Sequence, residues 1–135
     1  MKKQNTKRRG LVLGKFAPLH KGHQLLIEQA IREMDEVIVM IYNCPETTDI
    51  PLDVRASWIK RIYPQVEVIE AWDGPTETGY APRIKKLNED YVLEKIKKPI
   101  THFYSSEPYG EHMSQALNCE KVTVDMARKI IPISR

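Results

Sequence analysis

Apolar residues along the chain gather in short continuous runs that alternate with amphipathic stretches. The run EVIVMIY at 36–42 is rich in β-branched residues and nearly continuous, which is typical of a parallel strand buried on both faces. The other runs are shorter but similar in character. Together they predict strands at 11–13, 36–42, 66–72, 101–106 and 121–125.

The stretches between these runs have helical spacing. After the first run, apolar positions recur at i, i+3, i+4 and i+7 in a helix that begins near Gly22, at Ile27, Ala30, Ile31 and Met34. A second helix is predicted at 52–64, ended by Pro64, with a core-facing stripe of Val54, Trp58, Ile59 and Ile62. Two further helices are expected at 84–97 and 110–117.

Strict alternation of strand and helix predicts an α/β fold, a doubly wound, Rossmann-like five-stranded parallel sheet with helices on both faces. Ligands of such sheets bind outside the carboxyl ends of the strands. We therefore expect the segments 14–23, 73–80 and 105–110 to converge on one crevice, where the chemistry should lie.

Composition adds few constraints. The chain has 135 residues and 21 basic against 18 acidic side chains, so a single domain at 10–135 is expected. Much of the basic excess falls in residues 1–9, which we interpret as a flexible, solvated tail, with nucleic-acid binding as the less favoured hypothesis. The sequence has no membrane-length apolar segment, and Cys44 and Cys119 lack the spacing of a zinc site, so a soluble cytoplasmic protein with reduced cysteines is expected.

The segment GKFAPLHKGH at 14–23 joins the first strand to the first helix. A helix N-terminus attracts phosphate, and glycine lets a ligand approach the backbone closely. Lys15, His20 and His23 add side-chain donors to the same turn. The spacing is neither that of a Walker P-loop nor GxGxxG, and no third ligand supports a metal site. Helix capping or simple surface exposure of the histidines is the alternative to a phosphate site.

The same ten residues resemble the GxFxPxHxGH motif of the HxGH nucleotidyltransferase superfamily. The stretches VRASW at 54–58, FYSSEPYG at 103–110 and VDMARKIIPIS at 124–134 are similar to the NadR-type nicotinamide-nucleotide adenylyltransferase domain. The resemblance implies transfer of AMP from ATP to the phosphate of nicotinamide mononucleotide, which forms NAD and releases pyrophosphate. Mg²⁺ would be carried by the nucleotide phosphates and not by a protein cage.

The resemblance also implies roles for individual residues. His20 and His23 would contact the triphosphate, His23 nearest the transferring phosphorus, and Lys15 would offset phosphate charge. Nucleotide binding would further involve Gly14, Phe16, Ala17, Gly22, Ser105, Ser106, Glu107, Arg128 and Ser134. Acceptor binding is expected from Arg55, Trp58, Trp72 and Tyr80. For several of these residues a structural role is the alternative: core packing for Trp58, an ion pair for Arg55, and a capped turn for Ser105 to Glu107.

Two departures from the family pattern bear on the function. The family motif continues as ISxTxxR, whereas this sequence ends at PISR, so either the chain is a fragment, which we favour, or part of the ATP site is lost. Between Thr76 and Asn88, Tyr80 is the only aromatic residue, where NadR-type domains place tryptophans. Two other hypotheses therefore stay open: a cytidylyltransferase acting on CTP and a sugar- or polyol-phosphate, and a non-catalytic nucleotide-binding module. A homo-oligomer is also left open.

Overall fold

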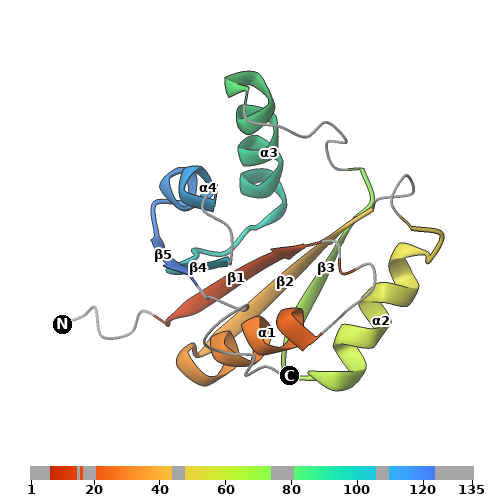
Figure 1. Cartoon of the computed structure of the whole chain (residues 1–135). Helices are drawn as coiled ribbons and strands as arrows, with labels where there is room; N and C mark the ends of the chain where they lie inside the picture. Colours follow the sequence, from red (N-terminus) through yellow and green to blue (C-terminus); the bar gives the residue numbers. More distant parts are fainter. Residues whose placement is uncertain are drawn as a thin grey trace, which may run out of the picture.

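A five-stranded parallel sheet forms the centre of the computed structural model, which describes residues 7–14, 16, 21–43, 48–73, 81–105 and 110–123 (Figure 1). Its strands lie in the order β3-β2-β1-β4-β5, and each neighbouring pair is parallel. The strands are β1 (Arg9–Gly14), β2 (Glu36–Tyr42), β3 (Glu67–Ala71), β4 (His102–Ser105) and β5 (Glu120–Thr123). The predicted parallel sheet is confirmed.

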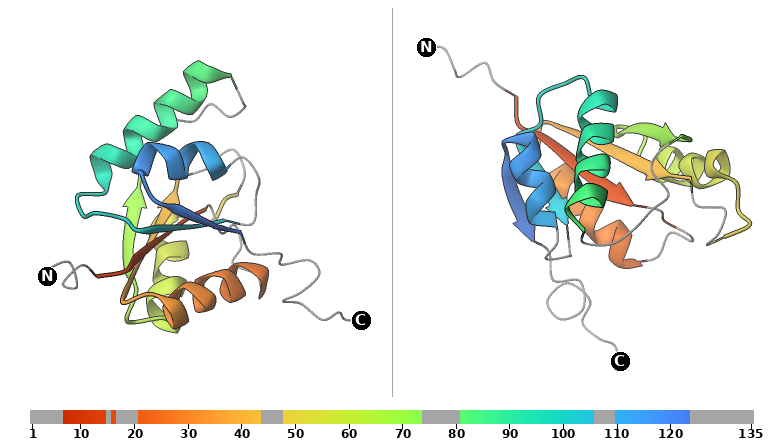
Figure 2. Two further views of the ribbon diagram at one scale, coloured as in Figure 1. Left: turned by 90° about the vertical axis from the view of Figure 1, so that its left-hand side faces the viewer. Right: turned by 90° about the horizontal axis from the view of Figure 1, so that it is seen from above.

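Helices cover both faces of this sheet, as predicted (Figure 2). Helices α1 (Lys21–Glu33) and α2 (Leu52–Ile62) pack on one face, and α3 (Pro82–Lys95) and α4 (Gly110–Leu117) lie on the other. Because side chains alternate along a strand, neighbouring residues of β1 enter different cores. Leu11 belongs to the core beneath α3 and α4, whereas Val12 belongs to the core beneath α1 and α2.

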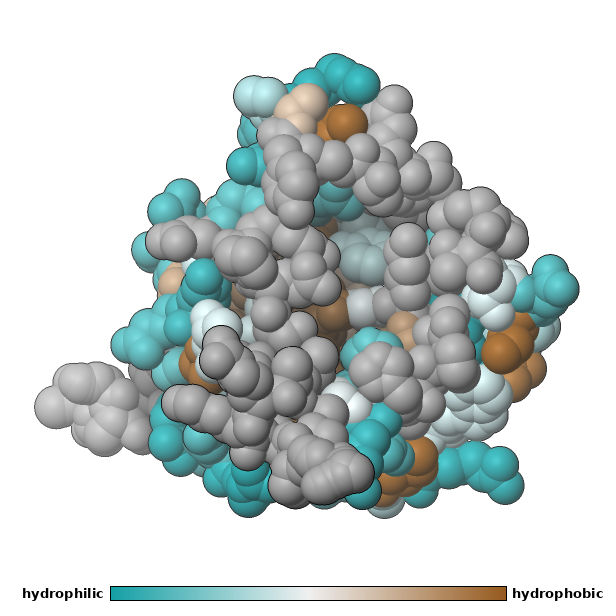
Figure 3. Space-filling model, in the orientation of Figure 1, coloured by the Kyte–Doolittle hydropathy of each residue, from teal (hydrophilic) through white to brown (hydrophobic). Residues whose placement is uncertain are grey.

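Helix α2 corrects the predicted core stripe. Val54 and Ile62 are 38% and 46% exposed, and apolar surface is visible on the flank of α2 in Figure 3. Of the predicted stripe only Ile59 is fully buried, and the face against the sheet comprises Leu52, Arg55, Ala56 and Ile59. By hydropathy alone, Arg55 is expected to face solvent. Here backbone carbonyls accept hydrogen bonds from its N–H groups, and this helix face can therefore be buried.

Residues 7–9, at which the described part of the chain begins, are bound to the sheet by hydrogen bonds. Arg9 begins β1 and donates from Nε to Glu36 Oε1 at 2.7 Å, and Lys7 Nζ lies 3.0 Å from Glu36 Oε2. The backbone N–H of Arg8 donates to Asp35 Oδ2 at 2.8 Å. Residues 7–9, which the sequence assigns to the basic tail, therefore contact the start of β2.

We expect the contact of Lys7 and Arg9 with Glu36 to make the free energy of unfolding depend on pH in the acid range. Hydrogen bonds from Lys7 and Arg9 lower the pKa of Glu36 from 4.5 to about 2. A carboxylate with a depressed pKa in the folded state contributes stability above its unfolded pKa and loses it as pH falls toward the folded pKa. Urea unfolding between pH 4.5 and 2 should therefore show a steeper loss of stability in the wild type than in Glu36→Gln. Equal slopes for the two proteins would contradict the assignment.

Candidate functional site

The strand order has its topological switch point between β1 and β4, where sheets of this kind bind their ligands. The strand that follows β1 in the sequence, β2, lies beside one edge of β1, and β4 lies beside its other edge. The connections that leave the carboxyl ends of β1 and β4 therefore run apart. Val12 pairs with Tyr104, and the same register puts Ser105 level with Leu13, next to Gly14. Two of the three predicted segments, 14–23 and 105–110, thus start side by side.

Phe16 organises the turn after β1. Its backbone has a positive φ of 49°, and its ring is 2% exposed. The ring covers Gly14 so closely that a Cβ there would lie 2.8 Å from Phe16 Cζ. On its other side the ring meets His23 edge-on, with centroids 4.8 Å apart and planes at 88°. The glycine, the phenyl ring and the imidazole are therefore held in one packed stack.

His23 lies in the first turn of α1, beside the buried Gly22. The first backbone N–H groups of a helix have no partner within the helix and carry partial positive charge. This first turn contains no acidic residue, so no fixed negative charge on it opposes an anion. An imidazole and a helix N-terminus at the end of β1 are together suited to hold phosphate oxygens.

This packing predicts the effect of Gly14→Ala. The new methyl group would meet three atoms of the Phe16 ring at 2.8 to 3.1 Å, so the ring must move and His23 loses its support. We expect ATP affinity, measured by calorimetry, to fall at least about 10-fold. Gly10→Ala at the other end of β1 is the control, because its Cβ would approach the flexible Met34 side chain and the Tyr104 ring. Equal losses in both variants would argue against the stack.

Several residues with predicted roles lie outside the described part of the chain. Their roles stay predictions, and the residues are Lys15, Ala17, His20, Tyr80, Ser106, Glu107, Arg128 and Ser134. Of the predicted catalytic and nucleotide-binding residues the structure brings together His23 with Gly14, Phe16, Gly22 and Ser105. Ser105 is buried at the end of β4.

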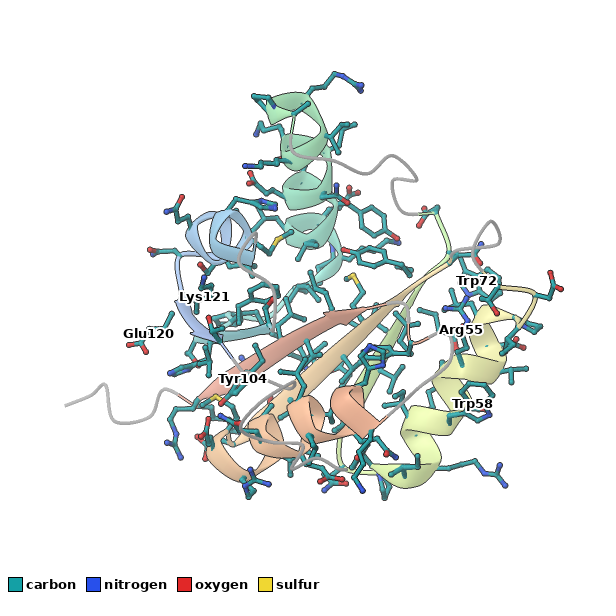
Figure 4. The ribbon with its side chains drawn as sticks, in the orientation of Figure 1. Arg55, Trp58, Trp72, Tyr104, Glu120 and Lys121 are labelled. Atoms are coloured by element: carbon teal, nitrogen blue, oxygen red, sulfur yellow. The ribbon has the colours of Figure 1, made fainter. Side chains whose placement is uncertain are left out.

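The described residues predicted to bind the acceptor lie near β2 and β3, on α2 and just after β3 (Figure 4). Arg55 is 1% exposed, and donates from Nε to Ile50 O at 3.1 Å and from Nη1 to Tyr42 O at 3.0 Å. It thereby fixes the start of α2 to the end of β2. Trp58 is half-buried on α2, and Trp72 is 53% exposed with its Nε1 donating to Glu70 Oε1 at 2.8 Å.

Sequence reasoning missed a polar cluster at the ends of β2 and β3. We call Tyr42, Asp73, Tyr91 and Lys95 the Asp73 cluster. The Tyr91 hydroxyl donates to Asp73 Oδ1 at 2.7 Å, and Lys95 Nζ lies 3.6 Å from the same oxygen. The ring centroids of Tyr42 and Tyr91 are 6.5 Å apart. The hydrogen bond from Tyr91, then a backbone hydrogen bond at Asp73 and the charge of Lys95, lower the pKa of Asp73, whereas burial and the hydrogen bond to Asp73 raise the pKa of Tyr91. The i, i+4 spacing of Tyr91 and Lys95 on a predicted helix was the available signal.

Two negative findings complete the description of the site. In the ranges that the structure describes, no three histidine, cysteine or carboxylate side chains are grouped to hold a metal ion. None of the helices in those same ranges is long and apolar enough to cross a membrane.

The sequence matches the model of a known family, described as cytidylyltransferase-like, over residues 11–127. The chain belongs to the cytidylyltransferase-like family. The match extends from within β1 past β5 and so includes all but the first residues of the sheet, with the carboxyl ends of β1 and β4. Membership of the cytidylyltransferase-like family thus agrees with the superfamily that GKFAPLHKGH indicates.

Curated relatives of this cytidylyltransferase-like chain carry two different names. A phosphopantetheine adenylyltransferase of Fusobacterium nucleatum is 38% identical over 116 residues, which are 85% of this chain and 69% of that protein. A nicotinamide-nucleotide adenylyltransferase of Methanococcus maripaludis is 26% identical over 117 residues, 84% of this chain and 63% of the relative. A protein of the latter name from Methanothrix thermoacetophila is 56% identical over 34 residues, 25% of this chain and only 20% of its own length.

Among solved structures, a NadR protein in complex with NAD and AMP-PNP has the same fold, with a TM-score of 0.68 and 18% identity. The match covers 90% of this chain and 39% of that one. A bifunctional NMN adenylyltransferase/ADP-ribose pyrophosphatase from Francisella tularensis matches with a TM-score of 0.63 and 16% identity over 89% of this chain and 38% of the other. The similarity to these two longer chains concerns the fold of this domain.

Proposed function

We propose that this domain transfers AMP from ATP to the phosphate of a small acceptor and releases pyrophosphate. The packing of His23 against Phe16, at the N-terminus of α1 and beside the ends of β1 and β4, carries the proposal. Nicotinamide mononucleotide is the acceptor that we favour, with NAD as the product. Phosphopantetheine is the second candidate, because a relative of that name is 38% identical over most of the chain.

The chemistry of the proposed reaction suits a site built of hydrogen-bond donors. An ionised phosphate oxygen of the acceptor attacks the α-phosphorus of ATP in line, a new P–O bond forms, and the bond to the β-phosphate oxygen breaks as pyrophosphate leaves. No general base is required, because phosphate is already ionised at neutral pH. The barrier is then lowered by positioning and by neutralising charge that develops on the α-phosphate.

In this proposal His23 and the first N–H groups of α1 hold the α- and β-phosphates, and Gly22 lets them approach the backbone. Ser105, level with Leu13, would lie on the nucleoside side of the crevice. The described donors are an imidazole, a hydroxyl and backbone N–H groups, all of which can bind phosphate, and no carboxylate of the kind that holds Mg²⁺ in proteins is among them. Mg²⁺ would therefore enter on the triphosphate and supply charge neutralisation there. The roles proposed for Lys15, His20 and Arg128 follow the family motifs.

A thermal-shift panel tests this proposal through binding alone. Its ligands are ATP, CTP, nicotinamide mononucleotide, NAD, phosphopantetheine and glycerol 3-phosphate. A ligand at 100 times its dissociation constant stabilises the folded state by about 2.7 kcal/mol, which is readily measured. We expect stronger stabilisation by ATP than by CTP, and stronger stabilisation by nicotinamide mononucleotide and by its product NAD than by phosphopantetheine or glycerol 3-phosphate. Preference for CTP would indicate a cytidylyltransferase, and no response to any nucleotide would contradict the proposal.

A further inference from the structure

Tyr63 connects the end of α2 to the first two turns of α1. Its backbone is fixed at the end of α2, where its N–H donates to Ile59 O at 2.8 Å and its carbonyl accepts from the N–H of Val66 at 3.0 Å. The residue is 6% exposed and belongs to the core beneath α1 and α2. Its hydroxyl donates to Glu28 Oε2 at 2.7 Å and lies 3.4 Å from Gln24 O. One phenol thus contacts two successive turns of α1.

The Tyr63 hydroxyl is a constant hydrogen-bond donor to α1. Burial, and then the hydrogen bond to the Glu28 carboxylate, raise the pKa of Tyr63 above its ordinary value. The hydroxyl therefore keeps its proton throughout the neutral range of pH. A buried hydroxyl without an acceptor is costly in free energy. The core thus favours the position of α1 in which Glu28 and Gln24 O face this hydroxyl.

The contact with Tyr63 lies next to the candidate phosphate site. Gln24 directly follows His23, and both residues belong to the first turn of α1 together with the buried Gly22. An α-helix rises 1.5 Å per residue, so Glu28 lies only about 7.5 Å along the helix axis from His23. A displacement of α1 at this end would move the imidazole and the first N–H groups of the helix together relative to β1. The alignment of these donors therefore depends on what holds the first two turns.

A second buried tyrosine contacts the opposite end of α1. Tyr104 of β4 is 1% exposed, and its hydroxyl donates to Glu33 Oε1 at 2.5 Å. Glu33 is the last residue of α1, about 15 Å along the helix axis from His23. The two contacts have the same chemistry, a buried phenol that donates to a glutamate of α1. Because only the contact of Tyr63 adjoins the first turn, Tyr104 provides a matched control.

We propose that Tyr63 is a positioning residue of the AMP-transfer site. Through Glu28 and Gln24 O its hydroxyl sets the position of the first turn of α1, where the phosphates of ATP are held. This inference rests on the proposed function, in which His23 and the first N–H groups of α1 bind phosphate. Tyr63 acts through α1 and needs no contact of its own with ATP. Misplacement of such donors by about 1 Å can cost about 100-fold in rate.

The variant Tyr63→Phe removes the hydroxyl and keeps the buried ring. Calorimetric titration of the full chain with ATP, and with inorganic pyrophosphate as a probe without a nucleoside, measures the effect without turnover. We expect both dissociation constants to rise at least about 5-fold in Tyr63→Phe and to stay at the wild-type values in Tyr104→Phe. Each variant loses one hydrogen bond to a charged group, so the two unfolding temperatures should fall by similar amounts. Equal losses of affinity in both variants, or wild-type affinity in Tyr63→Phe, would overturn the inference.

Replacement of the acceptor tests the same hydrogen bond from its other side. Glu28→Gln keeps a side-chain oxygen that can accept from Tyr63, whereas Glu28→Leu offers none. We expect Glu28→Gln to bind ATP more tightly than Glu28→Leu does. Equal affinities of these two variants would contradict the role of the hydrogen bond.

Nuclear magnetic resonance spectra of the free protein make the test independent of the proposed function. In Tyr63→Phe the signals of the His23 imidazole and of the Gly22 and His23 N–H groups should shift, and in Tyr104→Phe they should stay at their wild-type positions. Unshifted signals in Tyr63→Phe would overturn the inference. Shifted signals in a chain that binds no ATP would support the positioning of α1 by Tyr63 and contradict the proposed function.

Discussion

Replacement of His23 by alanine is expected to lower the rate constant of AMP transfer at least about 100-fold, the loss typical of removing one donor to a developing charge. The fold should persist, because His23 is only half-buried and Phe16 stays packed on Gly14 and within the core beneath α1 and α2. Single-turnover measurement of AMP transfer separates this loss from weaker ATP binding. Far-ultraviolet circular dichroism and the unfolding temperature check the fold.

A second histidine provides the control for this experiment. His102 lies on β4, with Nδ1 2.8 Å from Thr101 Oγ1 and Nε2 3.5 Å from Glu120 Oε1. It pairs in register with Gly10, at the far end of β1 from Gly14. His102→Asn should keep the wild-type rate. A wild-type rate in His23→Ala would remove this residue from the site.

Replacement of Arg55 by methionine is expected to reduce the free energy of unfolding by about 3 kcal/mol, or roughly 10 °C in unfolding temperature. Methionine preserves much of the aliphatic volume but supplies no donor. The carbonyl oxygens of Ile50 and Tyr42 would each lose a hydrogen bond from a side chain that is 1% exposed. Partly buried acceptors that lose their donor cost stability to the extent that water does not replace the lost hydrogen bond.

Urea unfolding with Arg61→Met as the control measures this effect. Arg61 is exposed on the same helix, so its replacement should change stability by less than about 0.5 kcal/mol. Near-equal stabilities of the two variants would contradict the structural role of Arg55. Acceptor binding to Arg55→Met can also be measured below the unfolding temperature of the variant. This measurement tests the role in acceptor binding that the family resemblance implies for Arg55.

The fold followed from the sequence because its strongest patterns are local. The continuous run at 36–42 is β2 with its predicted bounds, and the stretch 110–117 is α4 with its predicted bounds. Helix α2 shows where this reasoning fails. Its sequence allows two apolar stripes, and hydropathy favours the one with Val54, Trp58 and Ile62. The sheet takes the face with Arg55, because carbonyls from β2 and from the loop before α2 accept its N–H groups.

The candidate site was predicted where it lies within one short segment of sequence. Gly14 and His23 belong to a single motif, and their closeness follows from a strand, a turn and a helix in succession. The role of the Phe16 ring was not predicted, because the motif suggests only a backbone contact there. The Asp73 cluster was not predicted either, because the i, i+4 spacing pairs Tyr91 with Lys95 but their contact with Asp73 depends on how α3 packs over the ends of β2 and β3.

The central claim is that this domain catalyses transfer of AMP to a phosphate. Its most direct test is release of pyrophosphate from ATP by the chain with Mg²⁺, in the presence and absence of each acceptor. We expect release that requires nicotinamide mononucleotide, yields NAD in equal amount and is lost in His23→Ala. Release with CTP in place of ATP, or none with any acceptor although ATP binds, would contradict it.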